Sequence, residues 1–72
     1  MKAYEIIEKA KAQSAELEEG EALYYSLDNE DIILGLDGCQ PSNTFCLCTE
    51  SEKDQPWGEA LESLEEWLYQ YS

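Results

Sequence analysis

The sequence predicts an α+β fold in which a helix, a three-stranded antiparallel β-meander and a second helix follow one another. Apolar residues recur with helical spacing near both ends of the chain and alternate with other residues in the segments between them. The 72 residues correspond to a single small domain, residues 1–72. Both helices are expected on one face of the sheet, because each has a single apolar stripe and three strands enclose one core.

The first helix is expected over residues 3–18. Its stripe of small and apolar side chains consists of Ala3, Ile6, Ile7, Ala10, Ser14 and Leu17. Two ion pairs at helical spacing are expected to stabilise it, Glu5 with Lys9 and Glu8 with Lys11. Gly20 is expected to end the helix in a left-handed conformation, which glycine adopts without steric cost.

Three strands are expected after this helix, at residues 22–28, 32–36 and 44–49. Within the first strand every second residue from Leu23 onward is large and apolar, which is typical of a strand with one buried face. The polar residues 28–31 suit a hairpin turn between the first two strands.

The last helix is expected to begin near Pro56, a residue favoured in the first turn of a helix. Its apolar face would consist of Trp57, Leu61, Leu64, Leu68 and Tyr71. The opposite face carries Glu59, Glu62 and Glu66, with Glu65 at the border.

The three cysteines are predicted to be reduced thiols. An odd number of cysteines in a chain without a secretory signal indicates the cytoplasm, and the spacing of Cys39, Cys46 and Cys48 matches no standard zinc pattern. Cys46 and Cys48 are expected as small strand residues on one face of the sheet. A Cys39–Cys46 disulfide across a hairpin is the alternative that the sequence leaves open.

Catalysis, a cofactor and a dedicated metal site are not expected. The chain has neither His nor Arg, so its serines have no imidazole to activate them. An EF-hand loop starting at Asp28 would place Ile32 where the third calcium ligand belongs. No apolar run reaches the roughly 20 residues that a membrane span needs.

The charge distribution is the strongest functional signal. Two of the 17 acidic residues and three of the four lysines lie within residues 1–11, so residues 12–72 carry fifteen acids against Lys53 alone, a formal charge of −14. Such a field destabilises the folded state by self-repulsion and exceeds what solubility needs. It also opposes direct binding to nucleic acid or anionic lipid. The acids expected to contact a partner form three sets: Glu59, Glu62, Glu65 and Glu66; Asp28, Glu30, Asp31 and Asp37; and Glu16, Glu18, Glu19 and Glu21.

Four aromatic side chains fall at the margins of the expected apolar stripes: Tyr4, Tyr24, Trp67 and Tyr69. Tyr and Trp beside carboxylates would suit a protein interface. The alternative is that Trp67 and Tyr24 cover the margin of the core. The two interpretations are equally favoured for Trp67, and for Tyr4 a role in an interface is not favoured.

Two stretches, Leu23–Ile33 and Leu64–Leu68, together with the order of elements, resemble the small acidic DNA mimics among the anti-CRISPR proteins of phages and mobile elements. The resemblance implies a cytoplasmic, non-enzymatic inhibitor, acting in the host cell if it is phage-encoded. Its acids would occupy the Lys/Arg groove in which a nucleic-acid-binding effector or nuclease admits DNA. Two alternatives are an immunity protein or antitoxin that neutralises a basic nuclease, and an accessory domain from a salt-adapted organism.

Overall fold

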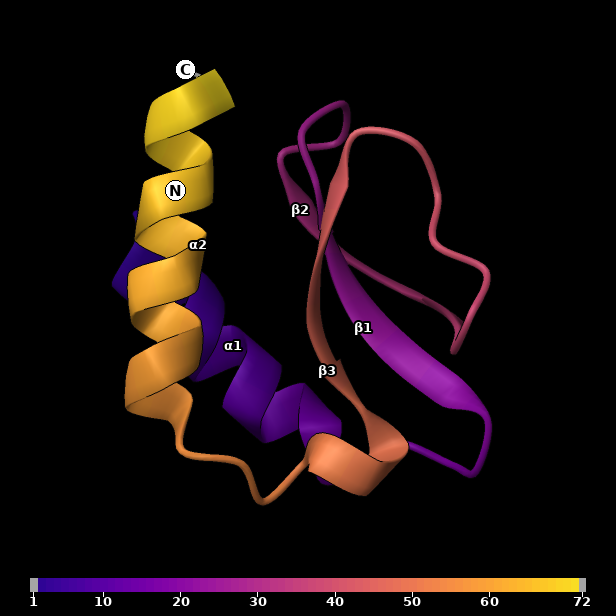
Figure 1. The fold of residues 1–72 in the computed structure, drawn as a ribbon. Coiled ribbons are helices and arrows are strands. Elements are labelled where there is room, and N and C mark those ends of the chain that lie inside the picture. The colour runs from indigo at the N-terminus through magenta and orange to yellow at the C-terminus, as the bar shows by residue number, and fades with distance from the viewer. Residues whose placement is uncertain (1, 72) are drawn as a thin grey trace.

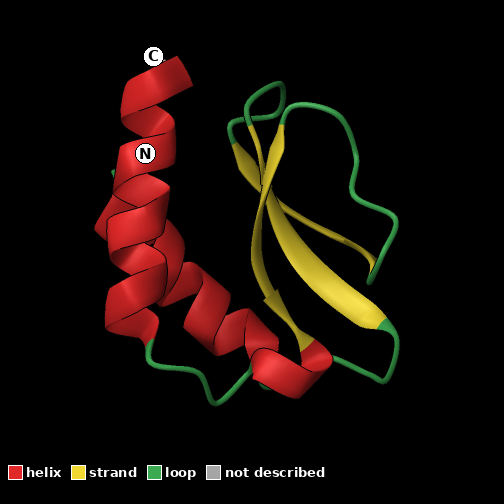
Figure 2. Cartoon of the chain, in the orientation of Figure 1, coloured by secondary structure: helices red, strands yellow, loops and turns green. Residues whose placement is uncertain are grey.

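Two helices cover one face of a three-stranded antiparallel sheet (Figures 1 and 2). The computed structural model describes residues 2–71. In chain order the elements are α1 (Ala3–Ser14), β1 (Glu21–Ser26), β2 (Asp31–Leu36), β3 (Thr44–Thr49), the short 3-10 helix η1 (Glu50–Glu52) and α2 (Trp57–Tyr71). The predicted α+β class, the order of the elements and the placement of both helices on one face are confirmed.

The order of strands in the sheet differs from the predicted meander. It is β2-β1-β3, so β1 is the central strand, whereas a meander would place β2 at the centre. The burial of residues 22–26 along β1 suits a strand that is covered on both faces. The connection 37–43 therefore passes from one edge of the sheet to the other, on the side away from the helices (Figure 1).

Helix α1 is shorter than expected. It ends at Ser14, whose hydroxyl donates a 2.8 Å hydrogen bond to the carbonyl of Lys11, and a turn carries the chain to Leu17. Leu17 lies beyond the last residue of the helix and is still buried, so the apolar stripe continues past the end of α1. Gly20 has φ +87°, which confirms the predicted left-handed position although the helix ends well before it.

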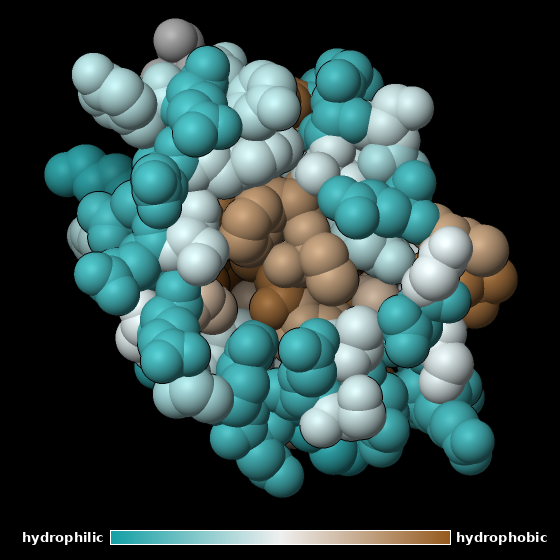
Figure 3. All heavy atoms as spheres, in the orientation of Figure 1, coloured by the Kyte–Doolittle hydropathy of each residue, from teal (hydrophilic) through white to brown (hydrophobic). Residues whose placement is uncertain are grey.

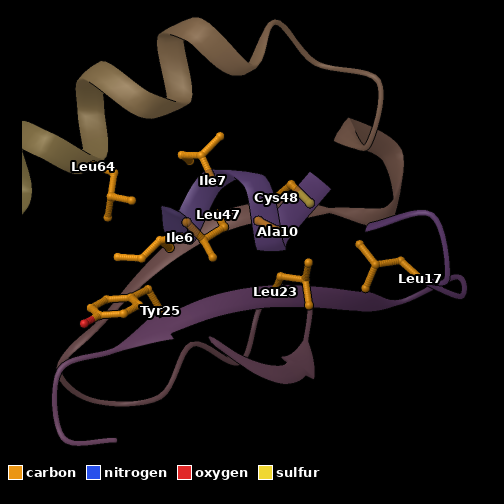
Figure 4. Close-up of a cluster of buried hydrophobic side chains, with 9 residues drawn as sticks. All are labelled: Ile6, Ile7, Ala10, Leu17, Leu23, Tyr25, Leu47, Cys48 and Leu64. Carbon is orange, nitrogen blue, oxygen red and sulfur yellow. The ribbon is translucent and has the colours of Figure 1, made fainter. Parts of the chain in front are cut away.

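The β1 strand is buried on both of its faces because Tyr24 covers the outer one. Leu23 and Tyr25 join the core on the helix side (Figure 4). The Tyr24 side chain is only 2% exposed, and its hydroxyl donates a 2.6 Å hydrogen bond to the carbonyl of Leu36. Its ring packs on Gly35, where an added Cβ would come within 2.9 Å of Tyr24 Cε2. The interpretation that placed Tyr24 at an exposed interface is therefore wrong.

An irregularity in the β1–β3 ladder separates the two cysteines of β3. The register shifts between Leu23, which pairs with Cys48, and Tyr24, which pairs with Cys46. As a result the neighbours Leu47 and Cys48 both belong to the core, whereas Cys46 is half-buried and outside it (Figure 4). The prediction that Cys46 and Cys48 share one face was wrong, because a bulge breaks the alternation of side chains. All three cysteines are free thiols, so the Cys39–Cys46 disulfide is absent among the described residues.

Helix α2 contributes one fully buried residue, Leu64, and a flanking aromatic group to the core. Trp67 packs edge-on against Tyr25 and lies 5.5 Å from Phe45 between ring centroids, so it occupies the margin of the core. Tyr71 packs on Trp67 with tilted rings whose centroids are 5.2 Å apart, and it lies on the side of α2 that faces Leu27 and Thr44, although it is 62% exposed.

Candidate acidic interface

Four carboxylates on α2 form a regular acidic surface. We call this set, Glu59, Glu62, Glu65 and Glu66, the α2 acidic row. All four are exposed, and with Ser63 and Tyr69 they line a shallow, open depression. Apolar residues of α2 face the sheet, so the acids are left on the solvent side of the helix. Figure 3 shows hydrophilic residues over the α2 side of the molecule and a hydrophobic area between α2 and the sheet.

No lysine neutralises the α2 acidic row. Within residues 2–71 the ion pairs are Lys9–Asp31 at 2.7 Å, Lys11–Glu8 at 3.4 Å and Lys53–Glu50 at 3.6 Å. None of them involves α2. An approaching cationic surface therefore meets the row without competition from the protein's own lysines.

The hairpin acids Asp28, Glu30 and Asp31 form a second, partly neutralised set. Lys9 on α1 donates a 2.7 Å hydrogen bond to Asp31, and this bond, with one from the Ile32 N–H, lowers the pKa of the Asp31 carboxyl. The predicted Glu5–Lys9 pair is replaced by this link between α1 and β2, whereas the predicted Glu8–Lys11 pair is confirmed. The Asn43 amide lies 3.5 Å from Asp28.

Asp37 belongs to a third set at the opposite end of the sheet. Its backbone N–H donates a 2.9 Å hydrogen bond to the carbonyl of Gly20, and it lines a shallow pocket with Glu19, Glu21 and Glu50. Asp37, which the sequence places at the next turn, therefore lies apart from the hairpin acids. The reason is the register of β1 with β2, which pairs Glu21 with Leu36 at this end and Ser26 with Asp31 at the other.

Glu16, Glu18 and Glu21 have different roles from one another. Glu21 is half-buried, and its carboxylate accepts a 2.8 Å hydrogen bond from the backbone N–H of Glu18, so it closes the turn before β1. Glu16 lies apart, beside Leu17 and Leu34 at the edge of the core. The twelve predicted acids thus occupy separate places on the molecule, and only the α2 acidic row is a regular array.

Sequence reasoning missed Glu50, which joins the third set while pairing with Lys53. The segment 50–55 has no apolar anchor and reads as an unstructured connection. The overlooked signal was Thr49 followed by Glu52, a capping box that starts η1: the Glu52 carboxylate accepts from the Thr49 N–H at 3.3 Å.

Among the exposed aromatics, Tyr69 is 84% exposed beside the α2 acidic row, and Tyr4 is 57% exposed.

The thiol and phenol groups of the sheet are held in their neutral forms. Burial, with the Cys46 thiol and the Glu52 carboxylate nearby, raises the pKa of Cys48 to about 11. Burial also raises the pKa of Tyr24, and the nearby Cys46 and Asp37 add to the effect. Neither group has the lowered pKa of an activated nucleophile.

In the described part of the chain, no three His, Cys, Asp or Glu side chains converge closely enough to hold a metal ion. None of the helices within residues 2–71 combines the length and apolar character needed to cross a membrane. Comparison with protein-family models, with curated proteins and with solved structures found no match to this chain.

Proposed function

We propose that this protein is a non-enzymatic inhibitor that binds a basic nucleic-acid-binding protein and blocks its DNA site by charge mimicry. The observation that carries the proposal is the α2 acidic row, whose four carboxylates are exposed on one helix without a paired lysine. A surface that repels itself lowers the stability of a small domain, and a cationic partner offsets that cost when it binds.

The spacing of the row is comparable in scale to that of phosphates along one DNA strand. With a rise of about 1.5 Å per residue, Glu59 and Glu62 are about 4.5 Å apart along the helix axis, and Glu62 and Glu66 about 6 Å. Phosphates on one strand of B-DNA recur about every 3.4 Å along its axis. A groove lined with Lys and Arg could therefore pair with the row through several of the contacts it makes to phosphates.

The cytoplasm is the proposed site of action. All three cysteines are free thiols, including the exposed Cys39, and such thiols persist in a reducing compartment. A phage-encoded inhibitor would meet its target in the cytoplasm of the host cell.

The test compares two triple variants with the same change in charge. Glu59→Gln, Glu62→Gln and Glu66→Gln together neutralise three positions of the row. The control neutralises Glu5, Glu8 and Asp54, which lie on α1 and in the segment between η1 and α2.

Partners are first recovered on the wild-type protein from a lysate of the source or host and eluted by rising salt or by duplex DNA. The affinity of the recovered DNA-binding protein should fall by at least about tenfold for the α2 triple variant and by much less for the control. Equal losses would show that net charge alone determines binding. Unchanged affinity of the α2 triple variant would remove the row from the site.

Two other results would point to the alternatives. Very tight one-to-one binding to a single nuclease, which added duplex DNA does not displace, would indicate an immunity protein. Retention of no specific partner, with folding that requires molar salt, would indicate a domain adapted to a salty cytoplasm.

A further inference from the structure

The two edges of the sheet are protected differently. On β3 the Gln55 amide donates to the carbonyl of Leu47 at 2.9 Å, and the Gln40 amide donates to the carbonyl of Thr44 at 2.8 Å. Side-chain amides therefore already donate hydrogen bonds to two backbone carbonyls of this edge strand. At the other edge, no strand within residues 2–71 pairs with the outer side of β2.

The register shows which backbone groups of β2 point outward. Asp37 N–H donates to the Gly20 carbonyl, which makes Glu21 and Leu36 a non-hydrogen-bonded pair of the antiparallel ladder. Because such pairs alternate and the register has no shift, Leu34 and Ile32 are also in non-hydrogen-bonded pairs. The N–H and C=O groups of these three residues of β2 therefore point away from β1.

Local partners satisfy only the ends of this edge. The Ile32 N–H donates to its neighbour Asp31 at 2.8 Å, and the Leu36 carbonyl accepts from the Tyr24 hydroxyl and, at 3.1 Å, from the Cys39 N–H. At the centre, the N–H and C=O of Leu34 have no partner among the described residues.

The side chains of this edge are apolar and exposed. Leu34 is 61% exposed and Leu36 is 60% exposed. Leu34 extends the core outward beside Leu17 and Leu23. Edge strands of soluble proteins are commonly protected by lysine, proline or a bulge, and the Ile32–Leu36 segment has none of these.

We propose that the outer edge of β2 binds an extended, lysine- or arginine-rich segment of the protein partner by β-strand addition. Acids surround the edge: Glu30 and Asp31 at the hairpin, Glu21 and Asp37 at the opposite end, and Glu16 beside Leu34. The backbone of the segment would pair with Leu34, its apolar side chains would cover Leu34 and Leu36, and its basic side chains would reach the surrounding acids.

A second copy of the chain is a poor occupant of the same edge. Each copy has a formal charge of −13, and antiparallel pairing of two β2 strands would bring the hairpin acids of one copy against Asp37 of the other.

Six residues of β2 span about 20 Å, which is enough for a partner strand to form several backbone hydrogen bonds.

The experiment uses a short peptide of alternating lysine and valine, and the same peptide N-methylated at every residue, which removes the N–H donors from both of its edges. Both carry the same charge, but only the first can form a complete backbone ladder. Binding of the unmodified peptide should slow hydrogen exchange at the Leu34 amide, and N-methylation should weaken the affinity by at least about tenfold. Equal affinities of the two peptides, or protection on α2 instead of β2, would overturn the proposal.

Two variants with the same change in charge separate the edge from the general field. Leu34→Lys places a cation at an exposed position of the edge, whereas Asp54→Asn neutralises an exposed acid in the segment between η1 and α2. The first should abolish protection of the edge, and the second should change the peptide affinity by no more than about twofold. Equal effects of the two variants, or dimers of the free protein formed through β2, would contradict the assignment.

This inference rests on the proposed function only for the basic character of the partner. The peptide experiment examines the edge without the partner, so its failure leaves the proposal for the α2 acidic row standing. Conversely, loss of that proposal would leave a measured peptide-binding edge unaffected.

Discussion

Glu62 lies at the centre of the α2 acidic row, and its replacement by glutamine is predicted to stabilise the fold. Three pairs of like charge in the row have the spacing of helix neighbours: Glu59–Glu62, Glu62–Glu65 and Glu62–Glu66. All three contain Glu62, and each costs about 0.2–0.5 kcal/mol. Glu62→Gln should therefore raise the free energy of unfolding by about 0.6–1.5 kcal/mol at low salt.

Glu59→Gln is the matched control. It removes only one of the three pairs, and it also removes an acid from the first turn of α2, where a negative charge interacts favourably with the helix dipole. The two effects are of similar size, so little or no stabilisation is expected.

Urea unfolding followed by circular dichroism, at low salt and again at high salt, measures both variants. The gain for Glu62→Gln should shrink as salt screens the carboxylates. A Glu62→Gln variant no more stable than wild type at low salt, or no more stable than Glu59→Gln, would refute the claim that the row is under mutual repulsion.

Three further predictions concern the core and the sheet. Gly35→Ala should lower the free energy of unfolding by about 1–3 kcal/mol, because its Cβ would press on the ring of Tyr24; Gly58→Ala, where nothing lies within 4 Å, should not, and equal urea midpoints for the two variants would contradict the packing. Leu64→Ala should cost about 2–5 kcal/mol, and an unchanged Tm would show that the core is wrongly assigned. The pKa of the Cys48 thiol is raised from 9.0 to about 11 in the folded protein. Between these values the thiol ionises in the unfolded chain but not in the fold. Its contribution to the free energy of unfolding is therefore full below about pH 9 and is lost as the pH rises above it. A free energy of unfolding that stays constant between about pH 8 and about pH 10.5, a range that spans the pKa of the thiol in the unfolded chain, would contradict this reasoning.

The order and type of the elements could be predicted because each has a strong local pattern. The spacing of Ile6, Ile7 and Ala10 and the sequence of 44–49 determine local structure with little help from the rest of the chain. The position of Leu64 on the buried face of α2 was predictable for the same reason.

The order of strands was not predictable, because it depends on contacts between distant residues. Alternation along β1 indicated one buried face, but Tyr24 buries the other face by packing on Gly35 and bonding to the Leu36 carbonyl. The bulge that separates Cys46 from Cys48 also depends on pairing with β1, and no local signal in β3 marks it.

For the candidate site, the α2 acidic row followed from helical spacing alone, since Glu59, Glu62 and Glu66 face away from the apolar stripe. The grouping of the turn acids did not. The placement of Asp37 beside Glu21 and the pairing of Asp31 with Lys9 both require the register of the sheet and the packing of α1. Sequence predicts the exposure of most of these acids, with Glu21 as an exception, and the fold determines which of them lie together.

The most direct test of the proposed mimicry is competition on the DNA-binding protein recovered from the lysate. Fluorescence anisotropy of a labelled duplex bound to that protein is followed as this acidic protein is added, at two salt concentrations. The account predicts that DNA is released in proportion to added protein, with weaker competition when Glu59, Glu62 and Glu66 are all glutamine. A complex that holds DNA and the acidic protein together, with anisotropy undiminished, would contradict it.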